Sequence, residues 1–451
     1  MDANVAAAAS PDAADRLIAR IEDRSASVGI IGLGYVGLPL AIAVAEAGFA
    51  VLGFDIDPAK ISDLGARRSY IRQVTPEALN RAGDRFTATA EFARLAEVDA
   101  ILICVPTPLG RHREPDLSFV IATAEAIAAT LRPGQLVVLE STTYPGTTLE
   151  IVRPILERRG LRSGHDFFLA YSPEREDPGN AVHATAAIPK VVSGDGPAAQ
   201  AAAIALYGAV VRSVVPVSTP ATAEAVKLTE NVFRAVNIAL VNELKVVFDA
   251  MGIDVWEVIE AAKTKPFGYM PFYPGPGLGG HCIPIDPFYL TWKAREFEVS
   301  TRFIELAGEI NTAMPRFVVD RLAAALDVRF GRGLSGASVL VAGLAYKPNV
   351  DDTRESPALR LIELIEARGG ITGYHDPLIP VLPQTREHAA LAGRRSVTLS
   401  PERLAAYDAV VIATDHDSLD LALISRHARL VVDTRNAMAR AGLAGPNVVK
   451  A

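Results

Sequence analysis

Val28-Gly29-Ile30-Ile31-Gly32-Leu33-Gly34-Tyr35-Val36-Gly37 is the stretch of sequence that decides the fold of this chain. A short apolar run of strand length leads into a Gly-x-Gly-x-x-Gly turn, and an alanine-rich segment of helical character follows as far as Gly48. Residues 51–55 are predicted to form the next strand, which Asp55 ends about twenty residues after the glycines. A strand, a glycine turn, a helix and a second strand in this order predict a βαβ unit that binds a dinucleotide.

The glycine turn and Asp55 together predict a site for NAD. Glycines at these positions allow a tight turn and let backbone N–H groups approach a pyrophosphate at the start of the helix. Asp55 is expected to accept hydrogen bonds from both ribose hydroxyls and to repel a 2′-phosphate, which favours NAD over NADP. Lys60 either flanks the ribose or is a solvated surface lysine, and glycines that only pack a helix on a strand are the alternative to a ligand site. The positions expected to hold the cofactor here are Gly32, Gly34, Tyr35, Val36, Gly37, Asp55 and Lys60.

Strands and helices alternate along most of the 451 residues, which are too many for one hydrophobic core. This alternation predicts an α/β fold with doubly wound parallel sheets. Helices are expected at 116–131 and 357–368. Strands are expected at 28–31, 51–55, 100–105, 136–139, 167–171, 338–342, 371–374, 409–413 and 430–432.

The two runs of strands predict two Rossmann-like domains with a helical domain between them. The boundaries that we expect are an N-terminal helix or extension at 1–27, an NAD-binding domain at 28–218, a central helical domain at 219–332 and a smaller α/β domain at 333–451. The central domain opens at about 221–250, where Pro and Gly are absent and apolar residues recur at helical spacing. This pattern predicts one helix of about thirty residues, ~45 Å long, of the kind that spans domains or forms a subunit interface.

One face of this long helix carries polar residues. Lys227, Asn231 and Arg234 are spaced i, i+4 and i+7, so they share a face. This face is either a solvated polar stripe or part of a site.

Composition narrows the class of protein. A net charge of −7 argues against general affinity for nucleic acid. No apolar run approaches the ~20 residues of a membrane helix, and the N-terminus lacks the pattern of a signal peptide. Two cysteines in a chain of this length favour a reducing cytoplasm over a disulfide framework. We therefore expect a cytoplasmic protein that binds neither nucleic acid nor a membrane and holds no metal. An anionic substrate is still possible, because local geometry governs binding sites and net charge does not.

The two cysteines differ in their surroundings. Cys104 lies within Ile-Leu-Ile-Cys-Val and is predicted to be a small buried residue. Cys282 ends a Pro- and Gly-rich stretch, whose glycines suggest a loop folded closely around something bulky, and Asp286 with Pro287 is predicted to open a helix just after it. A thiol near a helix N-terminus and a cation is a better thiolate. Cys282 is therefore either a reactive thiol or a structural loop cysteine, and His281 is expected to be a turn or surface residue.

Two further segments follow predicted strands, at the sheet edge where such folds contact ligands. They are 105–108, with Thr107 between two prolines, and 140–145, with Thr142 among hydroxyl residues. By themselves these patterns predict turns.

The motifs taken as a set resemble the UDP-glucose/GDP-mannose dehydrogenase family. They occur in family order over about 28–440 and cover the three predicted domains. The resemblance rests on Gly-Leu-Gly-Tyr-Val-Gly-Leu-Pro (32–39), Cys-Val-Pro-Thr-Pro (104–108), Ser-Pro-Glu (172–174), Lys227 with Asn231, Gly-Gly-His-Cys-Ile-Pro-Ile-Asp-Pro (279–287) and Gly-Leu-Ala-Tyr-Lys-Pro-Asn-Val-Asp-Asp-Thr-Arg-Glu-Ser (343–356).

The resemblance implies a reaction and a set of roles. NAD would oxidise a primary alcohol of a UDP-sugar twice, through a thiohemiacetal and a thioester on Cys282. The implied architecture is an NAD domain, a helical dimerisation centre and a C-terminal domain that holds the nucleotide. The implied catalytic residues are Cys282, Lys227, Asn231, Asp286, Glu174 and Thr142. Thr107, Thr142 and Arg354 would join the cofactor site, and the implied substrate contacts are Glu174, Arg175, Lys227, Asn231, Arg234, Phe272, Tyr273, Gly275, Gly277 and Lys347.

Within the family, 172–180 and 266–282 resemble the UDP-N-acetylglucosamine 6-dehydrogenases, which implies a product for surface polysaccharide synthesis. Pro178 stands where the family has a second glutamate, and Arg175 is the candidate to replace part of its role. Ile285 stands where UDP-glucose dehydrogenases carry a lysine. UDP-glucose and UDP-N-acetylmannosamine remain alternative substrates. A sugar-binding regulator and a two-electron dehydrogenase or epimerase are alternatives of other classes, and neither needs Cys282.

Overall fold

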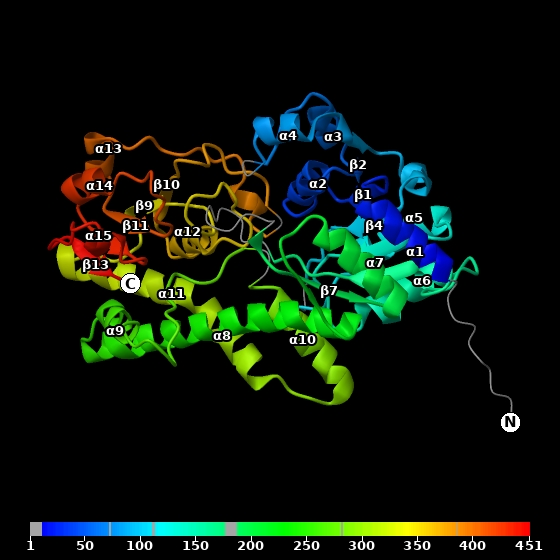
Figure 1. Ribbon diagram of the computed structural model, residues 1–451. Coiled ribbons are helices and arrows are strands. Elements are labelled where there is room, and N and C mark those ends of the chain that lie inside the picture. The colour runs from blue at the N-terminus through cyan, green and yellow to red at the C-terminus, as the bar shows by residue number, and fades with distance from the viewer. Residues whose placement is uncertain (1–10, 72–73, 111–112, 176–186, 281–282, 386) are drawn as a thin grey trace. The chain divides into compact units, whose positions relative to one another are not determined.

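The computed structural model describes residues 11–71, 74–110, 113–175, 187–280, 283–385 and 387–451. The chain forms two compact units (Figure 1). The first comprises residues up to Glu230 together with Phe288–Val299, and the second comprises Asn231–Pro287 together with Ser300–Ala451. Two helices, α8 (Pro220–Met251) and α10 (Asp286–Ala294), contribute residues to both units.

The first unit is built on a sheet of eight strands in the order β3-β2-β1-β4-β5-β6-β7-β8. The first six are parallel to one another and follow the strand order 3-2-1-4-5-6 of dinucleotide-binding folds. β7 runs antiparallel to β6, and β8 is parallel to β7. The strands are β1 (Ser27–Ile31), β2 (Ala50–Phe54), β3 (Phe86–Thr89), β4 (Ala100–Ile103), β5 (Leu136–Leu139), β6 (Phe168–Tyr171), β7 (Lys190–Gly194) and β8 (Val214–Pro216).

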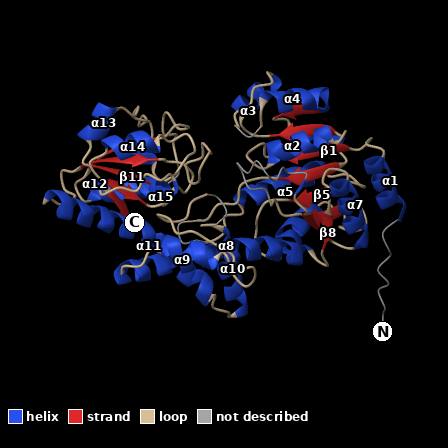
Figure 2. Ribbon diagram, turned by 60° about the vertical axis from the view of Figure 1, so that its left-hand side comes forward, coloured by secondary structure: helices blue, strands red, loops and turns tan. Residues whose placement is uncertain are grey.

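Helices cover both faces of this sheet (Figure 2). One apolar cluster joins the sheet to α1, α2, α4 and α7, and another joins it to α5 and α6. Strands buried on both faces are apolar without alternation, as the sequence pattern predicted. The helices are α1 (Pro11–Glu22), α2 (Gly37–Glu46), α3 (Pro58–Gly65), α4 (Pro76–Ala82), α5 (Ser118–Thr130), α6 (Arg153–Glu157) and α7 (Pro197–Gly208), with a short π-helix at Thr148–Val152.

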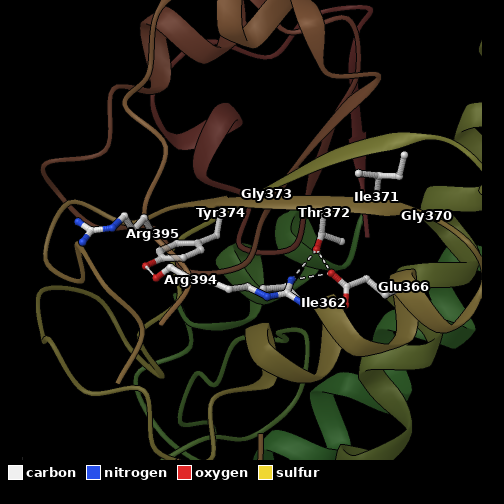
Figure 3. A pocket seen from close by; sticks show the side chains of 9 residues that line it. All are labelled: Ile362, Glu366, Gly370, Ile371, Thr372, Gly373, Tyr374, Arg394 and Arg395. Atoms are coloured by element: carbon white, nitrogen blue, oxygen red, sulfur yellow. Dashed lines mark hydrogen bonds and ion pairs between the residues drawn. The ribbon is translucent and has the colours of Figure 1, made fainter. Parts of the chain in front are cut away.

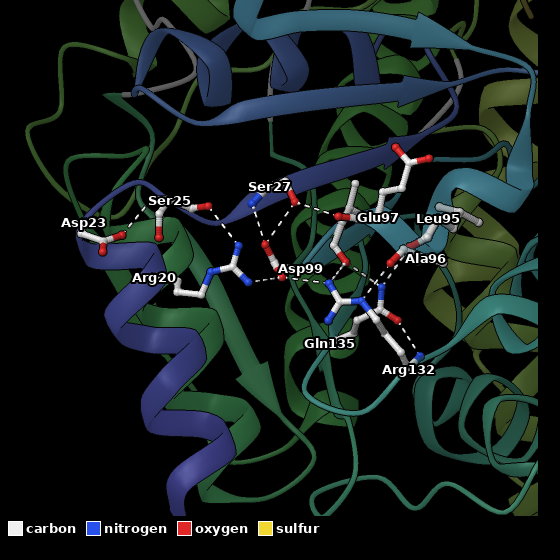
Figure 4. Close-up of polar contacts among 11 residues, drawn as sticks. Arg20, Asp23, Ser25, Ser27, Leu95, Ala96, Glu97, Asp99, Arg132 and Gln135 are labelled. Atoms are coloured by element: carbon white, nitrogen blue, oxygen red, sulfur yellow. Dashed lines mark hydrogen bonds and ion pairs between the residues drawn. The ribbon is translucent and has the colours of Figure 1, made fainter.

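Helix α1 is fixed at the end of the sheet away from the glycine turn (Figure 4). It packs along α7, and its Leu17 and Ile21 are buried. Asp99, which is 3% exposed just before β4, accepts from Arg20 of α1 at 2.6 Å and from Arg132 at 2.9 Å. Burial would raise the pKa of Asp99, but these cations and the Ser27 amide hold it below its ordinary value.

The second unit contains a five-stranded parallel sheet in the order β10-β9-β11-β12-β13. Counted from β9, this is the order 2-1-3-4-5, whose ligand crevice lies where the order reverses, between β9 and β11. Its strands are β9 (Ser338–Ala342), β10 (Ile371–His375), β11 (Ala409–Ile412), β12 (Val431–Asp433) and β13 (Val448–Lys450). Its helices are α9 (Val255–Ala262), α11 (Arg302–Phe330), α12 (Pro357–Ala367), α13 (Pro401–Ala406), α14 (Leu421–His427) and α15 (Ala437–Arg440).

The predicted fold class is confirmed: two doubly wound α/β sheets with a helical segment between them in sequence. The predicted long helix is α8, which has 32 residues. None of the helices in the described ranges has both the length and the apolar character that crossing a bilayer requires.

Candidate active site

The glycine turn after β1 has the geometry of a phosphate cradle. Gly32 has φ +91°, and a Cβ on Gly37 would lie 1.8 Å from the Gly32 carbonyl oxygen. Gly34 faces open space, since a Cβ there would meet nothing within 4 Å. Helix α2 starts at Gly37 without a side-chain cap. The turn therefore leaves both the room and the backbone N–H donors that a pyrophosphate requires.

Asp55 lies at the end of β2 and is held ionised. It is 6% exposed, and its Oδ2 accepts from the Leu33 amide and from Lys60 Nζ, both at 2.9 Å. The Asp57 amide donates to its Oδ1 at 3.0 Å. Burial would raise the pKa of Asp55, but these hydrogen bonds outweigh it and lower the pKa. Lys60 is thus placed beside the predicted ribose site as the partner of Asp55.

Ile56, which follows Asp55, was missed by the sequence analysis. Its side chain is 78% exposed at the ligand end of the sheet. An apolar residue directly after the acidic strand end was the available signal, and it suits contact with a flat base.

The two predicted strand-end segments meet each other. Thr107 Oγ1 donates to the Thr142 carbonyl oxygen at 2.8 Å, and Ser141 Oγ donates to the Val105 carbonyl oxygen at 2.7 Å. Cys104, at the end of β4, is buried in the apolar core, as predicted. The threonines Thr107 and Thr142 therefore lie at one edge of the sheet, in the same unit as the glycine turn.

Glu224 of α8 fixes the segment after Thr142, and sequence reasoning missed it. This fully buried carboxylate accepts from the amides of Gly146 (2.6 Å) and Thr148 (2.9 Å) and from the Thr148 hydroxyl (2.7 Å). Burial raises the pKa of Glu224 to about 7, although the three donors oppose the shift. A contact between residues so far apart in sequence leaves no local pattern.

Glu174 is 9% exposed and lies just beyond the end of β6. Its Oε2 accepts from Lys190 at 2.9 Å, and its Oε1 accepts from the Arg175 amide at 2.6 Å. The Arg175 guanidinium pairs with Glu230 at 2.6 Å.

Lys227 of α8 is only 5% exposed. In the part of the chain that the structure describes, no carboxylate forms an ion pair with it. A buried ammonium without a counter-ion is costly for a fold, so such a group is expected to serve a ligand.

In the second unit, Asn231 is oriented from both ends of its amide. Its Nδ2 donates to Asp286 at the start of α10, and its Oδ1 accepts from Arg234. Asn231 is fully buried and Asp286 is 3% exposed. The structure thus brings Asn231, Arg234 and Asp286 together.

The glycines of the loop before Cys282 pack closely against side chains of the same unit. A Cβ on Gly275 would lie 2.5 Å from the Arg435 guanidinium, and one on Gly280 would lie 2.8 Å from the ring of Tyr346. Gly277 has φ +132° and faces Pro357. Packing against 346–357 and Arg435 therefore accounts for these glycines.

Two buried asparagines, missed in the sequence, hold this loop. Asn242 Oδ1 accepts from the Gly275 amide at 3.0 Å, and its Nδ2 donates to Asn311 of α11 at 2.8 Å. Asn311 Nδ2 donates in turn to the Ala235 carbonyl oxygen at 3.1 Å.

The aromatic residues of the loop lie against α8 and α9. The rings of Phe272 and Phe233 are 5.7 Å apart, edge to face. Tyr273 stacks on Trp256, and its hydroxyl donates to Glu260 at 2.8 Å.

The segment after β9 repeats the design of the glycine turn. Gly343 has φ +82°, and Asp376 accepts from the Leu344 amide at 2.6 Å, as Asp55 does from Leu33. Asp376 has an additional donor, because His416 Nε2 donates to it at 3.1 Å. The other ring nitrogen of His416, Nδ1, accepts from the Asn349 amide at 3.0 Å.

This clamp holds the segment that follows β9 and carries Lys347. The Lys347 ammonium is 5.8 Å from the centre of the Tyr346 ring. Arg354 pairs with Asp352 at 2.6 Å.

A separate pocket of about 540 Å³ lies along β10 (Figure 3). Two of its charged residues pair with each other, since Arg394 contacts Glu366 at 2.6 Å, and none of the predicted site residues lines the pocket.

The predicted nucleophile Cys282 lies outside the described residues, as do His281 and Pro178. The described site residues divide between the units: the glycine turn, Asp55, Lys60, Thr107, Thr142, Glu174, Arg175 and Lys227 belong to the first, and Asn231, Arg234, Phe272, Tyr273, Gly275, Gly277, Asp286, Lys347 and Arg354 belong to the second.

Comparison with family models matches three consecutive parts of the chain. Residues 26–240 match the NAD-binding domain of the UDP-glucose/GDP-mannose dehydrogenase family, 221–313 its central domain and 340–440 its UDP-binding domain. The fold and the two nucleotide-binding domains define a nucleotide-sugar dehydrogenase that uses NAD. The chain belongs to the UDP-glucose/GDP-mannose dehydrogenase family.

Individual relatives differ in the sugar that their names give. The chain is 35% identical to the UDP-N-acetyl-D-glucosamine 6-dehydrogenase of Pseudomonas aeruginosa, over 86% of this chain and 90% of that protein. It is 36% identical to an NDP-N-acetyl-D-galactosaminuronic acid dehydrogenase of Ralstonia nicotianae, over 91% and 95%. The solved UDP-D-ManNAc dehydrogenase of Pyrococcus horikoshii superposes with a TM-score of 0.83 at 33% identity, over 94% and 97%.

The Asp55–Lys60 pair gives a prediction about cofactor choice. Asp55→Ala is expected to weaken use of NAD and to improve use of NADP, because it removes a ribose acceptor and leaves Lys60 without its partner. The measurement is kcat/KM with each cofactor. Asp63→Ala, which breaks an exposed pair with Arg68 on the neighbouring α3, is the control and keeps the wild-type ratio. Equal use of both cofactors by the unmodified protein would show that Asp55 does not face the ribose.

Proposed function

We propose that this protein oxidises the C6 alcohol of UDP-N-acetyl-D-glucosamine to the carboxylate of UDP-N-acetyl-D-glucosaminuronate, in two hydride transfers. Each bound NAD would accept one hydride. Cys282 adds to the intermediate aldehyde as a thiohemiacetal, and the second oxidation gives a thioester that water hydrolyses. The acid formed would supply surface polysaccharide synthesis. A thiol that must stay reduced suits the cytoplasm.

The observation that carries this proposal is the buried ammonium of Lys227, with which no carboxylate among the described residues forms an ion pair. Alkoxide and tetrahedral oxyanions form at C6 during the first hydride transfer, thiol addition and thioester hydrolysis. A fixed cation in a dry site stabilises that charge far more than it would in water.

The neighbouring side chains support the remaining roles. Asn231, held between Asp286 and Arg234, presents an oriented amide to the C6 oxygen. Asp286 orients or activates the hydrolytic water, and Glu174 and Thr142 act as acid/base and water ligand. Phe272, Tyr273, Gly275 and Gly277 form the sugar loop, while Lys347 and Arg354 reach the nucleotide and the cofactor. Thr107 and Thr142 complete the cofactor site.

The choice of N-acetylglucosamine rests on residues 172–180 and 266–282 and on the relative from Pseudomonas aeruginosa. The test is a panel of UDP-N-acetylglucosamine, UDP-N-acetylmannosamine, UDP-N-acetylgalactosamine and UDP-glucose, assayed for NADH formation. UDP-N-acetylglucosamine should give the highest kcat/KM. A higher value with another sugar would overturn the substrate, and no NADH with any of them would overturn the enzymatic function.

We also propose that the central helical segment forms a homodimer interface. Four apolar residues of α8 spaced 7, 7 and 4 positions apart share one helix face and are 45–64% exposed: Phe233, Leu240, Val247 and Met251. An apolar seam of this kind is buried when two copies meet through an isologous interface.

Sedimentation tests this assembly. The unmodified protein should be a dimer at micromolar concentration, and Leu240→Asp should shift it towards monomer because a charge enters the seam. Ile371→Asp replaces an exposed apolar residue (64%) on β10 and should leave the dimer intact. A wild-type protein that sediments only as a monomer would refute the proposed interface.

A further inference from the structure

The antiparallel strand β7 brings a lysine to the ligand end of the first sheet. Lys190 is the first residue of β7, and Tyr171, the last residue of β6, pairs with Ser193. The start of β7 therefore extends past the end of β6, where Glu174 follows. Glu140 comes directly after β5, the next strand. Topology thus places one ammonium between two carboxylates.

The three groups form one buried network. Lys190 Nζ donates to Glu140 Oε2 at 2.6 Å and to Glu174 Oε2 at 2.9 Å. The side chains of Lys190, Glu140 and Glu174 are 7%, 0% and 12% exposed. Tyr207 of α7 donates to the other oxygen of Glu140, and the Arg175 amide donates to the other oxygen of Glu174. Each carboxylate oxygen is therefore fixed by a donor.

The charges in this network are not balanced. Two carboxylates face one ammonium, so these three side chains together carry a net charge of −1 when all are ionised. Burial and the Glu174 charge raise the pKa of Glu140, while Lys190 opposes them. Burial lowers the pKa of Lys190, but the two carboxylates outweigh burial and raise it. The ion pairs therefore favour the charged form of Lys190, and Lys190 separates two carboxylates that would otherwise repel each other.

We propose that Lys190, anchored by Glu140, is a positioning residue that keeps Glu174 ionised and correctly oriented to accept a proton during the reaction. This inference rests on the proposed acid/base role of Glu174. Lys190 and Glu140 act through Glu174 rather than on the sugar, because both are more deeply buried than Glu174 and their side-chain polar atoms are used within the network. The sequence motif Ser-Pro-Glu thus depends on two residues outside it.

The first experiment measures the pH dependence of kcat/KM for the UDP-sugar. Lys190→Met should move the acid limb to higher pH by about 1–3 pH units, because Glu174 then loses the buried ammonium that stabilises its ionised form. Lys190→Arg keeps the charge and should restore the wild-type limb. Lys293→Met is the matched control, since Lys293 is 8% exposed and also bridges two glutamates, Glu150 and Glu296, in the same unit. It should keep the wild-type profile.

A second variant keeps the proposal testable if Lys190→Met does not fold. Lys190→Met with Glu140→Gln keeps the network at a net charge of −1 and should show the same displaced limb. Glu174→Gln distinguishes the positioning role of Lys190 from the acid/base role of Glu174. If it abolishes the acid limb while both Lys190→Met variants keep the wild-type limb, the positioning role is wrong and the role of Glu174 stands. If Glu174→Gln keeps the limb, the proposed role of Glu174 is wrong and the inference fails with it.

Thermal unfolding gives a readout that needs no activity. In Lys190→Met the folded state should bind an extra proton, because a buried carboxyl without its cation has a raised pKa. Its unfolding temperature, relative to wild type, should therefore be highest at low pH and should fall as pH rises from 5 to 8. Adding Glu174→Gln should reduce this fall. A pH dependence identical to that of wild type would contradict the charge coupling.

Discussion

Replacing Cys282 by alanine is expected to reduce formation of the sugar acid by several orders of magnitude. Without the thiol no thiohemiacetal forms, so the aldehyde is not held for the second hydride transfer. Cys282→Ser should form an ester slowly and hydrolyse it poorly, and a sugar covalently attached at position 282 should accumulate. Acid formation and the intact mass of the protein measure these two results.

Cys104→Ala is the control for this substitution. Cys104 is buried in the core beneath the glycine turn, where a Cβ on Gly32 would lie 2.6 Å from its carbonyl oxygen. The change should cost about 1 kcal/mol of stability and leave the products unchanged. Near-normal acid production by Cys282→Ala would remove the nucleophile from the mechanism.

Replacing Lys227 by methionine is expected to lower kcat by about 10²–10³-fold, the usual effect of losing one group that stabilises an oxyanion. Stability should not fall, because no ion pair among the described residues is broken and the cost of burying an ammonium disappears. The two measurements are kcat with the preferred UDP-sugar and the unfolding temperature.

Lys245 offers a control on the same helix at the same exposure of 5%. It pairs with Asp249 at 3.7 Å, and burial lowers its pKa. Lys245→Met should therefore change stability while keeping kcat, the reverse of Lys227→Met. Wild-type activity in Lys227→Met would refute the catalytic assignment, and a large loss of stability in it would show that Lys227 is a structural residue.

The fold could be predicted where apolar runs are continuous. Strands that are buried on both faces have such continuous apolar runs. The strands predicted at 136–139 and 338–342 coincide with β5 and β9. The strands β3, β7, β8 and β13 were not predicted. β7 begins with a lysine and lies at the antiparallel border of the sheet, so neither apolarity nor βαβ alternation marks it.

The candidate site was predictable only as far as motifs extend. Asp55 follows from the strand that it ends, whereas Lys227 and Asn231 came from the family resemblance. Their helical spacing also fitted a solvated face, and the structure shows both buried. Glu224, Lys190 and the pair Asn242–Asn311 act through partners that lie far away in sequence, which no local pattern records.

The sequence analysis predicted close packing around the glycine-rich loop, but it did not predict which groups the glycines approach. Many glycines suggested close approach to something bulky, and the neighbours found are Arg435 and Tyr346 of the same unit. Gly275 is additionally tied to Asn242 through its amide. Contacts within the same unit therefore determine the conformation of the loop. Its contacts with the sugar stay a prediction.

The most direct test of the four-electron oxidation is the number of NADH molecules formed per UDP-sugar consumed. Purified protein would be supplied with excess NAD and a limiting amount of UDP-N-acetylglucosamine, with NADH followed by absorbance and sugar products identified by mass spectrometry. Two NADH per sugar, with the uronate as the product, is the result that we predict. One NADH per sugar, with an aldehyde or ketone as the product, would contradict the oxidation through Cys282.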